Sequence, residues 1–123
     1  MPIDPATAVK LAATRTIELT TIGRRSGVPA RIEIWWFHID GRFLITGTPG
    51  PRDWYANVLD EPAVTVHSPF GDIAGHALPI TDPEVRRKLF GHGALSWYQT
   101  QAGLESLVAT SPMIEIVLER ELI

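Results

Sequence analysis

The stretch RTIELTTIGRRSGVPARIEIWWFHIDGRFLITGT, residues 15–48, decides the fold class of this chain. It is rich in β-branched and aromatic residues, which favour strands, and two turn signals interrupt it. The first is the glycine-bounded turn over 23–27, and the second is Asp40-Gly41, a pair typical of two-residue hairpins. The stretch therefore predicts three consecutive strands, over residues 15–22, 30–39 and 42–48. Residues 34–37, IWWF, are apolar at every position, so both faces of the second strand are expected to be covered.

The remainder of the chain predicts three more strands and three or four short helices. The strands are expected over 63–68, 72–80 and 114–119, the last with Ile114, Ile116 and Leu118 facing inward. Helices are expected over 5–13, over 54–59 with Asp53 as its cap, over 83–90, and from Ser96 onward through Leu104, Leu107 and Val108. Six hairpin-linked strands predict a mainly β (α+β) protein, a small antiparallel barrel, in one domain over residues 1–123.

The composition is that of an ordinary globular protein, with 123 residues of which 45% are hydrophobic and 20% are charged. The absence of cysteine excludes disulfides, thiolate metal sites and cysteine nucleophiles. Residues 1–15 lack the long apolar stretch of a signal peptide, and no apolar run approaches the roughly 20 residues of a membrane span. We therefore expect a cytoplasmic protein without stable membrane insertion.

Charge is unevenly distributed along the chain, although the net charge is only −3. Residues 1–52 carry seven basic and four acidic residues, whereas residues 53–123 carry four basic and ten acidic residues. A locally basic half in an acidic protein favours a small anionic ligand over a polyanion such as nucleic acid. Nine of the eleven basic residues are arginine, whose planar fork matches phosphate and carboxylate groups.

Sequence motifs of hydrolases and nucleotide-binding proteins do not occur in the chain. It contains no G-x-S-x-G, H-E-x-x-H, P-loop or G-x-G-x-x-G pattern. His67 and His76 could face each other across a hairpin at 69–72, but two imidazoles without a third ligand make a poor metal site. We therefore interpret these histidines as exposed or structural residues, and no metal is predicted.

The turn Gly23-Arg24-Arg25-Ser26-Gly27 is the most informative segment for function. Glycine permits positive φ and close approach of the backbone, so such a turn can aim N–H groups and guanidinium groups at one oxyanion. A solvated basic turn is the alternative interpretation, and the spacing alone does not decide between the two.

A second candidate segment follows the Gly/Pro-rich loop at 48–51. Arg52 is the expected anion contact there, because Asp53 competes for the free N–H groups at the helix start. Trp54 could form a wall for a planar ligand or belong to the core. The four tryptophans of the chain suit a flat aromatic ligand and a crowded barrel core equally well.

Four segments, in their order and spacing, resemble the deazaflavin-dependent nitroreductase family. They are LTTIGRRSGVP at 19–29, EIWW at 33–36, DWYANVL at 53–59 and PAVTV at 62–66. That family belongs to the split β-barrel group, which also contains the flavin-binding pyridoxamine-phosphate oxidases. The resemblance covers residues 15–90 well, and it implies a six-stranded split barrel that binds the 8-hydroxy-5-deazaflavin coenzyme F-420.

The resemblance also implies which residues contact this coenzyme, whose phosphate and oligoglutamate tail are anionic. The corresponding positions are Arg24, Arg25, Ser26 and Gly27 on the phosphate-binding turn, Ile34 and Trp35 against the ring, Gly47 and Thr48 at the end of a strand, and Trp54 at a helix start. Tyr98 corresponds loosely to the tyrosines that cover the substrate pocket of relatives, where it would donate a hydrogen bond or a proton.

The resemblance implies an oxidoreductase that passes hydride from the reduced deazaflavin to a small electron-poor acceptor, such as a quinone, a nitroaromatic compound or an activated enone. Because the coenzyme supplies the chemistry, no nucleophile–base pair is needed. Two alternatives remain open: an FMN-binding split-barrel oxidoreductase, and a non-catalytic carrier of a coenzyme or lipid. A homodimer is possible, since split-barrel relatives are often dimers.

Overall fold

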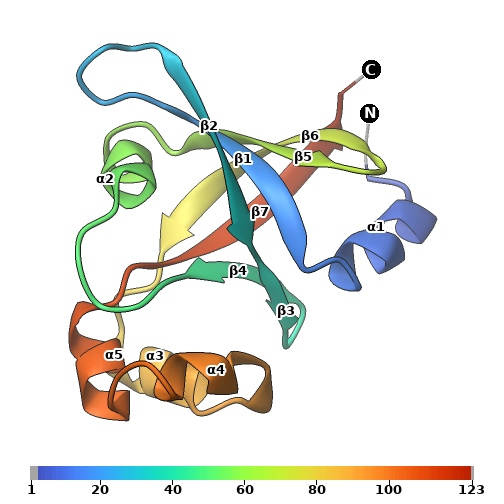
Figure 1. Ribbon diagram of the computed structural model, residues 1–123. Helices are drawn as coiled ribbons and strands as arrows, with labels where there is room; N and C mark the ends of the chain where they lie inside the picture. The colour runs from blue at the N-terminus through green and yellow to red at the C-terminus, as the bar shows by residue number, and fades with distance from the viewer. Residues whose placement is uncertain (1–2, 123) are drawn as a thin grey trace.

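The structure, a computed structural model, describes residues 3–122. Within them, seven strands form one antiparallel sheet in the order β2-β1-β5-β6-β7-β4-β3, which curls into the half-barrel of Figure 1. The strands are β1 (Thr16–Ile22), β2 (Pro29–Trp35), β3 (Phe37–Ile39), β4 (Arg42–Thr46), β5 (Ala63–Ser68), β6 (Gly71–Pro79) and β7 (Met113–Glu121). The helices are α1 (Pro5–Ala12), α2 (Asp53–Asp60), α3 (Pro83–Phe90), the 3-10 helix η1 (Gly93–Leu95), α4 (Ser96–Gln99) and α5 (Leu104–Thr110). The mainly β, split-barrel expectation is confirmed.

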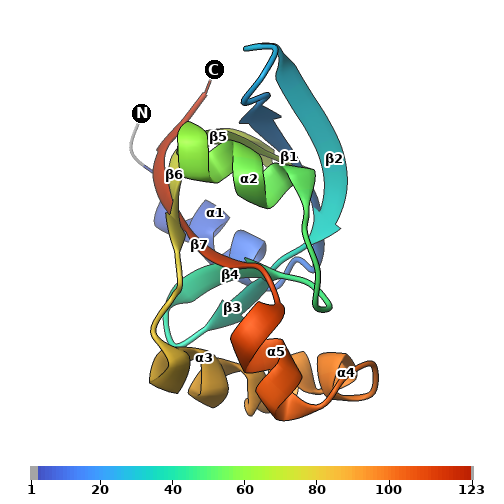
Figure 2. The same cartoon turned by 90° about the vertical axis from the view of Figure 1, so that its left-hand side faces the viewer.

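The expected second strand is in fact two strands, which corrects the predicted number from six to seven. Trp36 lies between the two strands. Its backbone N–H donates to the Arg15 carbonyl at 2.9 Å, which continues the β1–β2 register by one position, and its indole Nε1 donates to the Thr14 carbonyl at 2.9 Å. Before Trp36, β2 pairs with β1, whereas after it β3 pairs with β4 at the opposite end of the strand order. A single residue thus joins the two edge strands, and the sheet must curl to bring them together (Figure 2).

Two of the expected helix starts are confirmed, and the third is wrong. At α1 and α3 an aspartate side chain accepts a hydrogen bond from the N–H two residues later, at 3.0 and 2.9 Å, and proline follows the aspartate. At α2 the residue before the helix is Arg52, and Asp53 is the first helical residue. The Asp53 carboxylate does not cap the helix, because it lies 3.3 Å from Nη2 of Arg24 instead.

The single helix expected from Ser96 onward is also wrong. The helix α4 ends where the N–H groups of Gln101 and Ala102 both donate to the Tyr98 carbonyl, and α5 begins after Gly103. Residues 3–122 therefore hold five α-helices rather than three or four. None of the helices in this part of the chain is long and apolar enough to cross a membrane.

Two hydrophobic clusters form the core, one on each face of the sheet. One fills the barrel interior with residues of α1 and α2, and the other lies between the sheet and the helices α3, α4 and α5, which cover its lower side in Figure 1. Met113 belongs to the second cluster and its neighbour Ile114 to the first, because successive side chains of a strand point to opposite faces. The inward orientation of Ile114 and Ile116 is confirmed, and Leu118 is partly buried against the same cluster.

Candidate active site

A pocket of about 310 Å³ lies where the ends of β2 and β4 meet α4. It is lined by Glu33, Ile34 and Trp35 of β2, Thr46 of β4, Gly47, Thr48 and Arg52 of the following loop, and Trp97 and Tyr98 of α4. These three segments are far apart in the sequence. The pocket therefore forms only when the folded chain brings these segments together.

Two exposed tryptophan rings form one side of this pocket. Trp35 and Trp97 are 39% and 47% exposed, and their ring centroids lie 5.6 Å apart in an edge-to-face arrangement. The exposure of Trp35 contradicts the expectation that both faces of residues 34–37 are covered. The Arg15 guanidinium lies over the Trp35 ring, 5.7 Å from its centroid, in a cation–π contact. Large exposed aromatic rings beside a pocket are typical of ligand-binding surfaces.

Tyr98 places a phenol in the buried part of the pocket. It is 4% exposed and makes edge-to-face contacts with Trp97, Phe37 and Phe90 at centroid distances of 5.1, 5.9 and 6.5 Å. Burial raises the pKa of its phenol, and the positive charge of the nearby arginines offsets this only in part. Its hydroxyl has no hydrogen-bond partner among residues 3–122. A protonated phenol with a free O–H can donate to a ligand in the pocket.

The loop after β4 is held in shape by Arg52. Its guanidinium donates to the carbonyl oxygens of Thr48, Gly50 and Pro51 at 3.1, 3.2 and 3.1 Å, and to Thr48 Oγ1 at 2.9 Å. A Cβ at Gly47 would lie 3.2 Å from Nη2 of Arg52, so a larger residue there would require the guanidinium to shift by a few tenths of an ångström. Most donors of Arg52 are thus occupied by its own loop, and its charge, rather than its hydrogen bonds, is available to the pocket.

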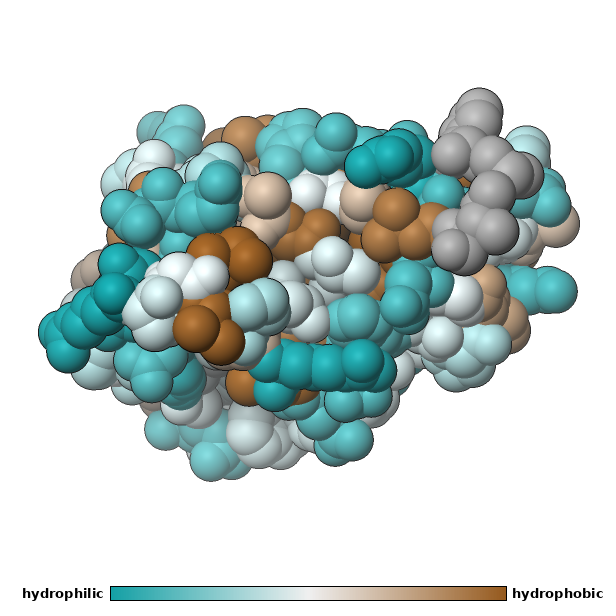
Figure 3. All heavy atoms as spheres, turned by 90° about the horizontal axis from the view of Figure 1, so that it is seen from above, coloured by the Kyte–Doolittle hydropathy of each residue, from teal (hydrophilic) through white to brown (hydrophobic). Residues whose placement is uncertain are grey.

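The β1–β2 turn has the free donors that an anion requires. Gly27 adopts a φ of 70°, which closes the turn with a 2.8 Å bond from its N–H to the Gly23 carbonyl, and the Ser26 hydroxyl accepts from the Val28 N–H at 3.1 Å. Within the described residues, the N–H groups of Arg25 and Ser26 and the exposed guanidinium of Arg25 make no hydrogen bond or ion pair. Figure 3, which views the molecule from the side of this turn, shows a mostly hydrophilic surface with small separate apolar groups.

Arg24 differs from its neighbour because it ties the turn to α2. Its Nη1 and its backbone N–H donate to Asn57 Oδ1 at 2.9 and 3.2 Å, and its Nη2 donates to Asp53 Oδ1 at 3.3 Å. Asn57 in turn donates to Thr21 Oγ1 at 3.1 Å, a buried bond. Arg24 therefore positions the turn, whereas Arg25 is the group that remains free for a ligand.

The turn and the aromatic pocket lie at opposite ends of β2. At about 3.3 Å per residue, the seven residues of this strand span roughly 20 Å. The segment Arg52–Asp53 connects the two ends, since Arg52 lines the pocket and Asp53 contacts Arg24 of the turn. An extended ligand with an aromatic end and an anionic end could therefore occupy both.

The structure brings some of the predicted site residues together and separates others. The pocket unites Ile34, Trp35, Gly47, Thr48, Arg52 and Tyr98. Trp54 is 8% exposed in the barrel core against Tyr55 and does not line this pocket. Three lining residues were not predicted: Glu33, Thr46 and Trp97. Glu33 directly precedes the predicted pair Ile34-Trp35, whereas no local pattern connects Trp97 to β2.

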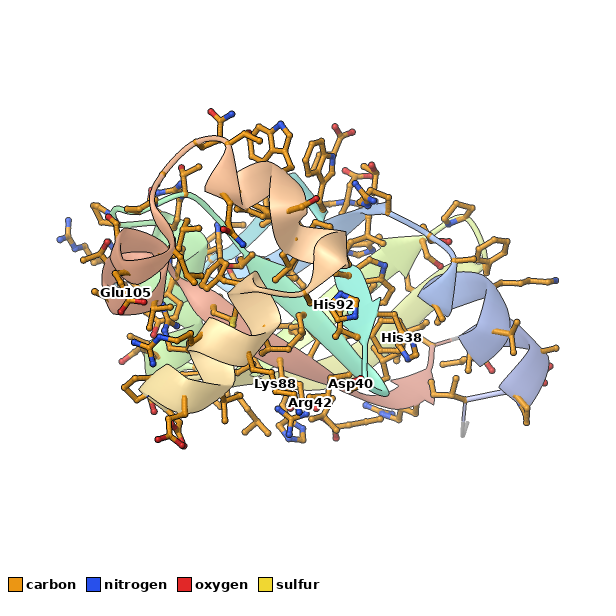
Figure 4. The ribbon with its side chains drawn as sticks, turned by 90° about the horizontal axis from the view of Figure 1, so that it is seen from below. His38, Asp40, Arg42, Lys88, His92 and Glu105 are labelled. Atoms are coloured by element: carbon orange, nitrogen blue, oxygen red, sulfur yellow. The ribbon has the colours of Figure 1, made fainter. Side chains whose placement is uncertain are left out.

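The histidines do not form a metal site. The β5–β6 register pairs His67 with Asp72 and His76 with Ala63, so the expectation that the two histidines face each other is wrong. His67 Nε2 lies 2.7 Å from Thr20 Oγ1, and its Nδ1 lies 2.9 Å from an Asp72 oxygen without hydrogen-bond alignment. No group of three metal-ligating side chains occurs in residues 3–122. Figure 4 labels titratable side chains on the lower side: His38, Asp40, Arg42, Lys88 and His92 lie near β3 and α3, and Glu105 lies apart from them on α5.

Comparison with known proteins yields a family match. The sequence profile described as F420H(2)-dependent quinone reductase matches residues 4–110. No curated protein sequence matches the chain significantly.

Solved structures show the same fold at low sequence identity. A FAD-binding protein from Mesorhizobium loti is 18% identical with a TM-score of 0.67, over 98% of this chain and 93% of that chain. An F420-H2 dependent reductase is 18% identical with a TM-score of 0.60, over 84% and 94%. A protein solved as a domain-swapped dimer is 17% identical with a TM-score of 0.61, over 91% and 94%.

Proposed function

The chain belongs to the F420H(2)-dependent quinone reductase family and is an F420-dependent reductase, and we propose that its aromatic pocket is the place where hydride passes to a quinone or another planar, electron-poor acceptor. The observation that supports this most directly is the placement of the free donors of the β1–β2 turn and the Trp35–Tyr98 pocket at the two ends of one strand, joined by Arg52 and Asp53. Such an arrangement suits a coenzyme with an aromatic ring at one end and a phosphate at the other.

The residues present fit coenzyme F420. The guanidinium of Arg25 and the free N–H groups of Arg25 and Ser26 would hold the phosphate, because charge-assisted hydrogen bonds to phosphate are strong. Ile34, Trp35 and Gly47 would lie against the ring, with Arg52 adding positive charge. FMN shares an aromatic ring and a phosphate with F420 and is the second candidate ligand, in keeping with the flavin protein of the same fold.

Coenzyme F420, when bound in its reduced form, supplies the hydride. A quinone that receives hydride and one proton becomes a hydroquinone, so the pocket must provide a donor to the acceptor oxygen. Tyr98 is suited to this role because burial keeps its phenol protonated and its O–H is free. Trp35 and Trp97 would cover a planar acceptor and exclude water from the reacting atoms.

Binding of the coenzyme is the first test. The purified protein is titrated with F420 and, in parallel, with FMN, and quenching of tryptophan fluorescence is followed. If the turn holds the phosphate, Arg25→Ala weakens F420 binding by about 1.5–3 kcal/mol, roughly ten- to a hundredfold. Arg120→Ala removes the same charge from an exposed position on β7 without a partner in the described part of the chain, and should leave the dissociation constant unchanged.

Turnover decides between the reductase and the two alternatives. Reduced F420 is mixed with the protein and menadione, a simple quinone, and its oxidation is followed by absorbance. Oxidation that depends on the protein supports the proposed reaction. Tight F420 binding without oxidation of the coenzyme by menadione or a nitroaromatic acceptor would favour a carrier, and tighter binding of FMN than of F420 would favour the flavin enzyme.

A further inference from the structure

A second and larger cavity, of about 750 Å³, lies on the other side of the loop that follows β4. Its walls come from that loop, from α2, from the β6–α3 connection and from the junction of α5 with β7. The lining residues are Gly50, Pro51, Tyr55, Ile80, Thr81, Pro83, Arg86, Arg87, Glu105, Val108, Ala109, Thr110, Ser111 and Pro112. Prolines and aliphatic side chains make up much of this surface, and the volume is within the range of roughly 300–1,000 Å³ that is usual for small-molecule sites.

The distinctive feature of this cavity is a buried arginine without an acidic partner. Arg86 is 6% exposed, and among residues 3–122 no carboxylate oxygen lies within 4.0 Å of its guanidinium. It donates through Nε to the Val108 carbonyl and through Nη1 to the Ile80 carbonyl, both at 2.7 Å. Nη2 donates to the carbonyls of Leu107, at 3.2 Å, and Ser111.

These four bonds leave one N–H group of Arg86 without an acceptor, and they do not neutralise its positive charge. A guanidinium has five N–H groups, so one on Nη1 has no acceptor. In addition, neutral carbonyl dipoles do not cancel a whole positive charge, and burial accordingly lowers the pKa of Arg86. A buried cation of this kind attracts an anion that can enter the cavity.

Two hydroxyl groups in the cavity wall also lack partners. The Tyr55 hydroxyl makes no hydrogen bond within the described chain, and this tyrosine interacts electrostatically with Arg86. Ser111 is 5% exposed, and its buried Oγ has no partner. Arg87 and Glu105 also line the cavity, but they neutralise each other through bonds of 3.1 and 2.7 Å. The uncompensated charge of the cavity is therefore that of Arg86.

We propose that this cavity binds a small organic monoanion, a carboxylate or sulfonate carried on an apolar ring or chain, with its anionic group toward Arg86 and Tyr55. The apolar body lies along Pro51, Pro83 and Val108. The charge of Arg86 selects the anionic group, and the scarcity of further free charges in the wall excludes a strongly charged ligand such as a polyphosphate.

The second site is separate from the aromatic pocket, although the two share one loop. Gly47, Thr48 and Arg52 line the aromatic pocket, whereas Gly50 and Pro51 line the larger cavity. This inference does not depend on the proposed reaction, because none of the residues that would contact F420 lines the larger cavity.

The test uses two probes that differ in charge, 1-anilinonaphthalene-8-sulfonate and its uncharged analogue N-phenyl-1-naphthylamine. Fluorescence titration is expected to show at least about tenfold tighter binding of the sulfonate. In a ¹⁵N-resolved spectrum the sulfonate should shift the amides of residues 109–111 and leave those of Gly47, Thr48 and Trp97 in place. Equal affinity for the two probes, or shifts confined to the latter three residues, would overturn the proposal.

A variant of the cavity wall provides the matched comparison. Ala109→Phe fills the cavity and should weaken sulfonate binding at least about tenfold, whereas Ser106→Phe, also exposed on α5 but outside the lining, should not. Saturating F420 should leave sulfonate binding unchanged. Displacement of the sulfonate by F420 would contradict a separate site. If the protein binds the sulfonate at residues 109–111 but does not bind F420, the proposed anion site is supported and only the proposed function is rejected.

Discussion

Trp36 Nε1 donates a 2.9 Å hydrogen bond to the carbonyl oxygen of Thr14. The backbone N–H of Trp36 bonds to the next carbonyl, that of Arg15, also at 2.9 Å. These two bonds fix the single residue between β2 and β3 against the start of β1. Trp36 also stacks on Phe43 of β4, with ring centroids 4.3 Å apart, so one side chain touches both parts of the sheet that the barrel brings together.

Replacing Trp36 by phenylalanine tests this closure. The Thr14 carbonyl loses its donor, and we expect the free energy of unfolding to fall by about 1–3 kcal/mol. Urea denaturation followed by circular dichroism measures the change. The control is Trp97→Phe, the same substitution at a ring that is 47% exposed. It should lower the free energy of unfolding by less than about 1 kcal/mol. Equal losses for the two variants would show that Trp36 has no special role in closure.

Tyr98 gives a prediction for the reaction. Since burial raises the pKa of its phenol above the ordinary value of about 10, the hydroxyl stays protonated through neutral pH. Tyr98→Phe should therefore lower kcat for menadione reduction by about ten- to a hundredfold, with F420 binding unchanged. Wild-type kcat should show no loss from Tyr98 ionisation between pH 6 and about pH 9. A Tyr98→Phe variant with wild-type kcat would rule out a donor role.

The same pKa shift affects stability at alkaline pH. The folded state holds the phenolic proton more tightly than the unfolded state, whose tyrosine ionises near pH 10. The contribution of the protonated Tyr98 to the free energy of unfolding is therefore complete below pH 10, and it is lost as the pH rises through the higher pKa of the folded state. Urea midpoints measured from pH 9 upward should fall more steeply for the wild type than for Tyr98→Phe. If the urea midpoints of the two proteins fall in parallel with pH, the raised pKa of Tyr98 is contradicted.

Asp53 should limit the affinity for an anionic coenzyme. Its side chain is 91% exposed and lies 3.3 Å from Arg24, so it places a negative charge beside the β1–β2 turn that is proposed to hold the phosphate. Asp53→Asn should strengthen F420 binding by about two- to fivefold, mostly at low salt, because exposed charges are screened. The control is Asp60→Asn at the other end of α2, which should leave the affinity unchanged. Weaker binding by Asp53→Asn would show that the carboxylate supports the site instead.

The core below the sheet can be tested at Phe37. This ring is 6% exposed and contacts Tyr98, whereas Phe70 in the β5–β6 turn is 41% exposed. Phe37→Ala should reduce the free energy of unfolding by about 3–5 kcal/mol through lost burial and a new cavity. Phe70→Ala should cost less than about 1 kcal/mol. A melting temperature of Phe37→Ala within a degree of the wild type would show that the ring is not part of the core.

Local sequence patterns predicted most elements of this protein correctly because they depend on neighbouring residues. The Asp40-Gly41 pair has φ angles of 51° and 78°, as a two-residue hairpin turn of type I′ requires. The aspartate-proline pairs that start α1 and α3 satisfy their first N–H groups within two residues. The family segments singled out the turn at 23–27, and an anion site there stays a prediction.

By itself, then, the sequence determined the β-rich class, the hairpins, the basic turn and the family, since each rests on residues close together in the chain. The tertiary structure alone decided that the predicted strand divides at Trp36, because the residues before it pair with β1 and those after it pair with β4. It also decided that Trp97 joins Trp35 at the pocket. Partners this far apart in the chain are chosen by how the sheet closes, and no local periodicity records that choice.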